Sequence, residues 1–239
     1  MINLMYHDIS TGTDMSSGFQ TQVSMDYKVD ETVFEEQVRC CKGKNVVFTF
    51  DDGGESFLTV AAPILEKYGF RGVFLISTSQ IGSKGFLSVD QIKELDKRGH
   101  IIGSHTHSHP KNLAKLNYDE IFQEWKISLD ILRQILCKDV PVASIPNGRG
   151  SVNVIKAAKD AGVNELYTSE PISSIYCKDG VTLIGRYVVL RSMSTTSVLK
   201  IVDSYFRRAI LRIKWGIINI FKSVLGKYYY NLRQMLVRK

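Results

Sequence analysis

Short apolar runs alternate along this chain with segments whose apolar residues recur at helical spacing. Strands are predicted at residues 2–6, 45–50, 71–76, 100–103, 140–145, 166–168 and 182–189, with helices between most of them. An alternation of this kind is the pattern of parallel βα units. Polar residues with functional character stand just after strands, and in a parallel barrel such positions gather at one face. The sequence therefore predicts an α/β barrel with its site at the carboxyl ends of the strands.

Polar cap residues mark the starts of several predicted helices. Asp30 and Ser88 precede two of them, and Asn117 with Glu120 three residues later forms a capping box for a third, which runs to about residue 136. We expect the apolar stripe of this third helix to be buried; it consists of Ile121, Trp125, Leu129 and Leu132.

The N-terminal residues 1–8 lack the basic and long apolar segments of a signal peptide, and we interpret them as a first strand that ends at His7. The chain contains no apolar run of about eighteen residues or more, the length that a membrane span needs. We therefore expect a cytoplasmic protein. Residues 10–28, rich in Ser, Thr, Gly and Gln, predict a long loop of the kind that is often functional.

Two clusters of polar residues follow two of the predicted strands. Asp51 and Asp52 end one strand, and His105, His107 and His109, three of the five histidines in the chain, follow another. A carboxylate with neutral imidazoles suits Zn²⁺ or a similar divalent ion, and a catalytic site of this type keeps one position open for water. The other carboxylate would take the proton from that water. These motifs indicate a metal-dependent hydrolase; the alternative is two unrelated loops.

Spacing alone leaves the ligand set open. His105 and His109 are four residues apart and share a face if the segment is helical, whereas His105 and His107 have a ligand spacing that suits an extended chain. Nor does the spacing decide which of the adjacent residues Asp51 and Asp52 is the ligand. His100 stands at the start of a strand, and we interpret it as a structural histidine.

The two motifs together identify a family resemblance. Thr-Phe-Asp-Asp-Gly at 49–53, followed by His-Thr-x-x-His-Pro at 105–110, resembles the polysaccharide deacetylase family, the NodB-homology domain of carbohydrate esterases. The similarity extends over about residues 3–191. It implies a distorted (β/α)7 barrel and a hydrolase that acts on a non-peptide C–N bond, removing N-acetyl groups from the sugars of a polysaccharide or a saccharide precursor.

The resemblance also implies roles for individual residues. Asp51 is the expected general base, and the expected ligands of the divalent ion are Asp52, His105 and His109. The expected metal is Zn²⁺, although the same ligand set accepts Co²⁺, Ni²⁺ or Fe²⁺. The ion would bind both the attacking water and the acetyl carbonyl oxygen, and His107 would lie outside the ligand set.

The chain departs from the family pattern in a motif that lines the substrate groove. Pro146, Asn147 and Gly148 stand where the family has Arg-x-Pro-Tyr-Gly, and they are the expected substrate-binding residues. The arginine of that motif helps to position the base, but Ser144 occupies its place here. Arg149, on the other side of the turn, is one candidate for the missing charge; a surface arginine is the alternative.

The second departure concerns the general acid. Many relatives protonate the departing amine with a late histidine in a Leu-x-x-His motif, whereas this chain has no histidine after His109. The pair Tyr6-His7 resembles the poly-β-1,6-N-acetylglucosamine deacetylase branch, in which an early histidine acts as the acid. We therefore assign His7 to this role; an inert histidine at a strand end is the alternative.

The net charge of +7 resides in the C-terminal segment. Residues 204–239 hold nine basic and no acidic residues, so residues 1–203 have 22 basic against 24 acidic groups. We therefore divide the chain into a catalytic domain, 1–203, and a basic amphipathic helix, 204–239, and expect no binding to nucleic acid. The apolar stripe of the helix consists of Phe206, Ile210, Ile213, Ile217, Ile220 and Val224.

Two interpretations of this helix remain open. It could bind peripherally to an anionic membrane at its inner face, or it could pack on the barrel with a solvated basic face.

The function itself also has alternatives of other classes. A metal-dependent phosphoesterase on a βα barrel would use similar ligands, and a saccharide-binding module with an inactive site would share the fold.

Overall fold

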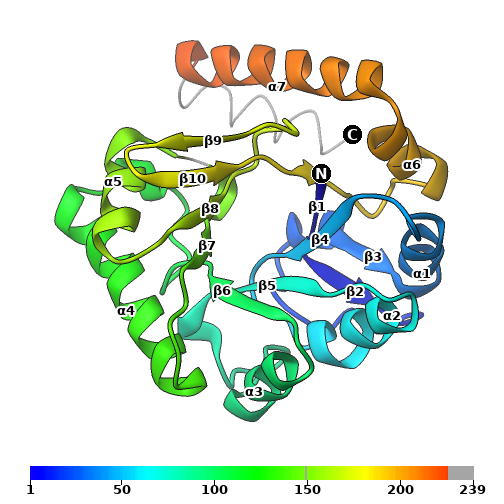
Figure 1. The fold of residues 1–239 in the computed structure, drawn as a ribbon, viewed down its shortest axis with the longest axis horizontal. Helices are drawn as coiled ribbons and strands as arrows, with labels where there is room; N and C mark the ends of the chain where they lie inside the picture. Colours follow the sequence, from blue (N-terminus) through cyan, green and yellow to red (C-terminus); the bar gives the residue numbers. More distant parts are fainter. Residues whose placement is uncertain (149, 226–239) are drawn as a thin grey trace.

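The computed structural model describes residues 1–148 and 150–225. Figure 1 shows a ring of strands with helices around its outside, as the alternation in the sequence predicts. The strands are β1 (Ile2–Tyr6), β2 (Asp8–Ser10), β3 (Lys28–Asp30), β4 (Val46–Phe50), β5 (Gly72–Ile76), β6 (Ile101–Ser104), β7 (Val142–Ser144), β8 (Glu165–Tyr167), β9 (Ile175–Lys178), β10 (Val181–Ile184) and β11 (Tyr187–Val188). The α-helices are α1 (Glu31–Cys40), α2 (Ala62–Lys67), α3 (Val89–Lys97), α4 (Tyr118–Leu136), α5 (Val152–Asp160), α6 (Thr195–Asp203) and α7 (Tyr205–Leu225).

The main sheet curls until its two edges nearly meet. Its strand order is β11-β1-β4-β5-β6-β7-β8-β10-β9, and its neighbouring strands pair in parallel except β9 and β10. Although β11 and β10 stand at opposite ends of the parallel part, only Gly185 and Arg186 separate them in sequence. The side-chain amide of Asn3 in β1 donates a hydrogen bond to the Gly185 carbonyl oxygen at 3.1 Å. The predicted distorted barrel is confirmed.

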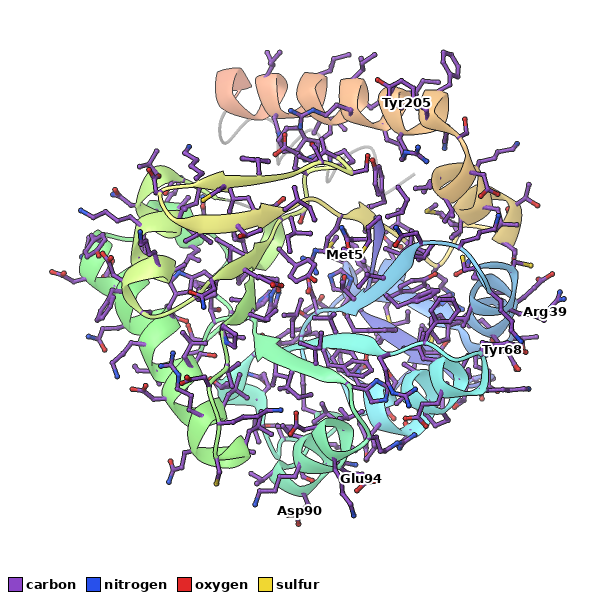
Figure 2. The ribbon with its side chains drawn as sticks, viewed as in Figure 1. Met5, Arg39, Tyr68, Asp90, Glu94 and Tyr205 are labelled. Carbon is purple, nitrogen blue, oxygen red and sulfur yellow. The ribbon has the colours of Figure 1, made fainter. Side chains whose placement is uncertain are left out.

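Two apolar clusters hold this barrel together. The larger one lies between the strands and the surrounding helices and includes four aromatic rings in mutual contact, those of Tyr6, Phe34, Phe48 and Phe50. The smaller cluster comes from the opposite faces of the strands and consists of Val73, Leu75, Val142, Tyr167 and Ile184. Met5 in β1 lies toward the middle of the ring in Figure 2. Because side chains on both faces of the strands are buried, the strands read as continuous apolar runs.

The predicted helix starts are confirmed. The Asp30 carboxylate accepts hydrogen bonds from two backbone N–H groups of the first turn of α1. Ser88 and Asn117 each form a capping box, with Gln91 and Glu120. The predicted stripe of α4 is buried in the larger cluster, and this fixes α4 beside the strand that carries the histidine motif.

Three local predictions differ from the structure. The predicted strand 182–189 is two strands, β10 and β11, because the chain turns at Gly185 and Arg186 to close the barrel. Strand β9, an antiparallel partner of β10, and helix α6 were not predicted. The helix expected between the strands at 45–50 and 71–76 begins as a single π-helical turn, Phe57–Ala61, and continues as α2, with Pro63 in the first turn of α2, where no helical N–H is needed.

The predicted C-terminal helix exists as α7, and the remainder of the segment, 226–239, lies outside the described residues. Among the helices that the structure describes, none combines the length and the apolar character needed to cross a membrane.

Candidate active site

The carboxyl ends of β4 and β6, with β5 between them, bring together the three predicted metal ligands. Asp52 Oδ1 lies 3.4 Å from the Nε2 atom of His105 and 3.4 Å from that of His109. One ligand atom from each residue falls within 4.8 Å of the others. Asp52 and His105 are buried, and His109 is half-buried. The structure therefore gathers one oxygen and two nitrogens around one point.

Hydrogen bonds determine which nitrogen of His105 faces this point. Its Nδ1 atom lies 3.2 Å from the Ser144 carbonyl oxygen, which can only accept, so Nδ1 carries the proton. It also lies 2.5 Å from the Ser144 hydroxyl, which donates to Asp51 at 3.1 Å. Nε2 is then an unprotonated acceptor that faces Asp52, as a metal-binding imidazole requires.

The electrostatics of this group fit a divalent cation. Burial raises the pKa of Asp52 to about 7 and lowers that of His105 to about 3; it also lowers the pKa of His109. Asp52 Oδ1 is buried and has no hydrogen-bond partner within the described residues. A buried carboxylate oxygen that faces neutral imidazoles and lacks a donor is costly by itself. A metal ion would satisfy all three atoms at once.

The loops that carry these ligands adopt unusual backbone conformations. Asp52, Thr106 and His109 have positive φ angles of 87°, 66° and 53°, a region that residues other than glycine rarely occupy. Backbone hydrogen bonds hold the loops in place: Ser77 N–H donates to the Asp52 carbonyl oxygen, and Thr78 N–H donates to that of Thr106. The loop after β5 therefore links the Asp-Asp loop to the histidine loop.

His107 takes a different direction. Its Nδ1 atom lies 3.0 Å from Thr78 Oγ1, and it is not part of the three-ligand group. Glu124 from α4 accepts hydrogen bonds from the backbone N–H groups of His107 and Ser108, and from the Ser108 hydroxyl. The buried stripe that fixes α4 thus also anchors the histidine loop.

His100 lies away from the site, at the other end of β6. Its Nδ1 atom accepts a hydrogen bond from Gly72 N–H at 3.0 Å, and its Nε2 atom lies 2.8 Å from Glu66. Its side chain is buried among these partners, in agreement with the structural role expected from the sequence.

Asp51 forms a buried ion pair that the sequence did not predict. Arg186, between β10 and β11, donates to both carboxylate oxygens, with Nη1–Oδ1 at 2.7 Å and Nη2–Oδ2 at 2.8 Å. Its Nε donates to the Thr168 carbonyl oxygen at 3.1 Å. Burial by itself would raise the pKa of Asp51, but the adjacent guanidinium and His105 hold it well below its usual range. Asp51 is therefore an ionised carboxylate in a nearly dry setting.

The missing charge of the family motif is thus supplied from another part of the barrel. Ser144, at the arginine position of that motif, contacts both Asp51 and His105 through its hydroxyl. Arg149, the candidate favoured by proximity in sequence, lies outside the described residues. The available signal for Arg186 was a lone charged residue after glycine within the apolar segment 181–190.

His7 lies at the end of β1, beside the Asp-Asp motif. Its ring centroid is 4.4 Å from that of Tyr27, and its Nδ1 atom is buried without a hydrogen-bond partner in the described part of the chain. After burial, the largest influence on the pKa of Asp52 is His7, which lowers it. The structure thus brings His7 within electrostatic range of the predicted ligands.

The segment 10–28, predicted to be a long loop, joins β2 and β3 and lies beside the site. The buried Lys28 ammonium donates to the carbonyl oxygens of Met15 and Ser17. The hydroxyl of Ser17 in turn donates to Asp8 at 2.7 Å. These bonds fix the loop so that Phe19 places its ring 5.2 Å from that of His109, centroid to centroid. Aromatic surface from this loop therefore lies next to a predicted ligand.

The predicted substrate-binding turn, Pro146–Gly148, follows β7 directly. Pro146 is buried, whereas Asn147 is exposed and has a left-handed φ of 56°, which asparagine tolerates well. The turn begins two residues after Ser144, which contacts Asp51 and His105. It therefore lies at the same end of the barrel as the metal-ligand group.

Comparisons with known proteins agree with this fold and these motifs. The family model described as polysaccharide deacetylase matches residues 39–166, more than half of the chain. The chain belongs to the polysaccharide deacetylase family. The family prediction made from the sequence is confirmed.

Individual relatives match more distantly. YxkH of Bacillus subtilis is 28% identical over 183 residues, covering 70% of this chain and 64% of YxkH. A chitin deacetylase of Arthroderma benhamiae is 36% identical over 98 residues, which are 41% of this chain and 26% of that protein. The chain thus spans less than two thirds of these relatives. The structure of Streptococcus pyogenes deacetylase PplD in complex with acetate has a similar fold, with a TM-score of 0.71, 23% identity, and coverage of 85% of this chain and 98% of PplD.

The Asp51–Arg186 pair predicts a coupled effect on stability. We expect Arg186→Met to lower the free energy of unfolding by about 3–5 kcal/mol, because it leaves a buried carboxylate without its partner. The double variant Asp51→Asn/Arg186→Met should lose much less, since it removes both charges. Urea denaturation of the wild type, both single variants and the double variant measures the coupling energy. Purely additive losses would show that the pair does not act as a unit.

The raised pKa of Asp52 predicts that protons compete with metal. A divalent ion binds the carboxylate form, and in the metal-free protein the pKa of Asp52 is about 7. Zn²⁺ affinity should therefore be level above that pH, where Asp52 releases no proton on binding, and should fall about tenfold for each pH unit below it, where binding releases one proton. Calorimetric titration of metal-stripped protein in buffers of different ionisation enthalpy measures both quantities. An affinity that stays level through this range would contradict the assignment of Asp52 as a ligand.

Proposed function

We propose that this protein is a metal-dependent hydrolase that removes N-acetyl groups from N-acetylated sugars. The observation that carries the proposal is an ionised, buried carboxylate, Asp51, adjacent in sequence to a buried ligand group of one carboxylate and two imidazoles. Membership in the polysaccharide deacetylase family gives the reaction class. The chitin deacetylase among the relatives is named for one such substrate.

In this proposal, Asp52, His105 and His109 hold the divalent ion, expected to be Zn²⁺. When bound, the ion supplies Lewis-acid polarisation of the acetyl carbonyl and lowers the pKa of the attacking water. The low pKa values of the two histidines leave their lone pairs available for binding at neutral pH.

Asp51 is the proposed general base. Its Oδ1 atom already accepts hydrogen bonds from Arg186 and Ser144, whereas Oδ2 accepts one from Arg186. Oδ2 is therefore the oxygen with more remaining acceptor capacity, and we assign it the proton taken from water. Arg186 keeps the carboxylate ionised before the reaction and fixes its orientation by two parallel bonds.

His7 is the proposed general acid. Hydrolysis of the amide needs a proton on the departing nitrogen, and the chain has no histidine after His109 to provide it. The place of His7 directly after β1, whose last residue Tyr6 pairs with Phe50 at the end of β4, supports this role, because it puts the imidazole beside the Asp-Asp motif.

The saccharide is proposed to bind across the end of the barrel. The turn of Pro146, Asn147 and Gly148 would line one side, and the loop that carries Phe19 and Tyr27 would line another. Support comes from the half-buried aromatic rings of this loop, which lie against His109 and His7. Their remaining exposed surface suits the apolar C–H face of a sugar ring.

The proposed partners are the saccharide and, through the C-terminal helix, the surface of a membrane. We retain residues 1–203 as the catalytic domain and the helix as an appendage. A cytoplasmic location at the inner face of the membrane remains a prediction, which fractionation of cells expressing the full protein would test.

The first expected result concerns acetate release. Metal-stripped protein should release acetate from N-acetylglucosamine oligomers only after addition of Zn²⁺ or Co²⁺. Asp51→Asn should bind the metal but lose at least about 100-fold in kcat, because the base is lost. Asp52→Asn should lose metal affinity instead. An enzymatic acetate assay with parallel metal analysis measures both effects.

The other outcomes separate the alternatives. Tight metal binding with hydrolysis of phosphate esters and no acetate release would identify a phosphoesterase. Saccharide binding without hydrolysis of either substrate would identify an inactive binding module. Absence of metal binding would refute the proposed function.

His7 can be tested separately from the metal. We expect His7→Ala to lower kcat by about 100-fold or more while zinc content is unchanged, since the variant removes the acid and leaves the ligands in place. His7→Gln, which fills most of the same space but cannot act as the acid, is the matched control for packing and should lose as much in kcat. Unchanged kinetics of His7→Ala with metal bound would reject this role.

A further inference from the structure

Helix α7 exposes several residues of its apolar stripe to solvent. The side chains of Phe206, Ile213 and Ile217 are 74%, 62% and 48% exposed. Their spacing of seven and four residues places them on one face of the helix. Tyr205, at the start of the same helix, is 79% exposed and lies on the outer side of the molecule in Figure 2. A terminal helix that packed on the barrel through its apolar side would bury these residues.

Other residues hold α7 on the barrel. Arg208 Nη1 donates to the carbonyl oxygens of Ile201 and Val202 at the end of α6, at 2.8 and 2.9 Å. Arg212 forms an ion pair with Glu170, in the loop between β8 and β9. Leu211 packs against the larger apolar cluster. At helical spacing these three residues lie opposite the stripe. The contacts therefore fix the helix with its apolar stripe directed away from the barrel.

The charges around the stripe have one sign. Residues 204–239 contain no acidic residue, and Arg207 and Lys214 follow directly after the exposed Phe206 and Ile213. Lys214 is itself exposed. Trp215, half-buried, lies with its ring 5.0 Å from the Arg212 guanidinium carbon. An exposed apolar stripe flanked by cations and aromatic residues is the pattern of a helix that lies in the plane of a membrane surface.

We propose that α7 docks this protein on an anionic phospholipid surface, with the stripe of Phe206, Ile213 and Ile217 inserted among the acyl chains near the headgroups. Charge complementarity selects this occupant, since the flanking Arg and Lys side chains attract acidic headgroups. The helix is not a membrane span by length and composition. The interaction is thus peripheral and reversible, and it weakens with salt.

This inference is independent of the proposed chemistry, because the contacts that hold α7 go to the end of α6 and to Glu170, which are not among the candidate site residues. It also bears on the two interpretations left open by the sequence. The helix does pack on the barrel, but the side in solvent is the apolar one.

Vesicle sedimentation of the full chain tests the proposal. The wild type should sediment with vesicles of phosphatidylcholine containing phosphatidylglycerol, and much less with phosphatidylcholine alone. Ile213→Glu/Ile217→Glu should lower the partition constant about tenfold or more, because it places charges in the inserted stripe. The matched control is Ile101→Glu/Val152→Glu, two residues that are 48% and 59% exposed elsewhere on the barrel, and it should bind as the wild type does.

Two further measurements keep the test decisive. Circular dichroism and the urea midpoint should show that all variants are folded, and acetate release from soluble oligomers should be the same for all of them. A wild type that does not sediment, or stripe variants that bind equally well, would overturn the proposal. So would a dimer, seen by light scattering, that the stripe variants dissociate, since a second copy would then be the occupant.

Discussion

The ion pair between Asp51 and Arg186 is the constraint on which the rest of the site depends. Asp51 follows β4 near the start of the chain, and Arg186 lies between the last two strands of the barrel. Both side chains are almost fully buried, so each charge would be costly without the other. The pair is satisfied only when the sheet has curled far enough to bring β10 and β11 around to β1 and β4. Closure of the barrel therefore brings in the positive charge that keeps the buried Asp51 carboxylate ionised.

The predicted metal-ligand group differs from the ion pair, because its carboxylate oxygen has no compensating partner among the described residues. Three hydrogen-bond acceptors meet here, and no donor within the described residues faces Asp52 Oδ1. Asp52 Oδ1 faces the Nε2 atoms of two histidines whose pKa values are lowered by burial. Ser144 links the two halves of the site, since its hydroxyl donates to Asp51 and accepts from His105. Asp51 is compensated by Arg186, whereas Oδ1 of Asp52 has no hydrogen-bond partner among the described residues and is where the proposed cation would bind. Two adjacent carboxylates thereby acquire different chemistry from their surroundings alone.

Features carried by contiguous residues could be predicted from the sequence. The strands that deliver Asp52 and His105 are apolar runs, and the helix caps at Asp30 and Asn117 are local hydrogen bonds. Arg186 could not be found in this way, because its role depends on a partner 135 residues away and on a chain turn inside an apparent strand. For α7, periodicity predicted the helix and its apolar stripe. It could not predict which side faces the barrel, since that is decided by Arg208 and Arg212, whose partners lie on other elements.

The position of Arg186 shows that such a site requires a positive charge beside the carboxylate, whereas the strand end that supplies this charge can differ. The family motif places an arginine two residues before the proline, and this chain has Ser144 there. A buried carboxylate requires a positive charge with suitable geometry, but it does not require that charge to come from a particular strand. In a curled sheet several strand ends surround the same carboxylate, so a guanidinium between β10 and β11 reaches Asp51 as directly as one after β7 would. The hydroxyl of Ser144, at the arginine position of the motif, contacts both Asp51 and His105. Loss of a motif residue is therefore weak evidence for an inactive site when another element of the same barrel end can supply the charge.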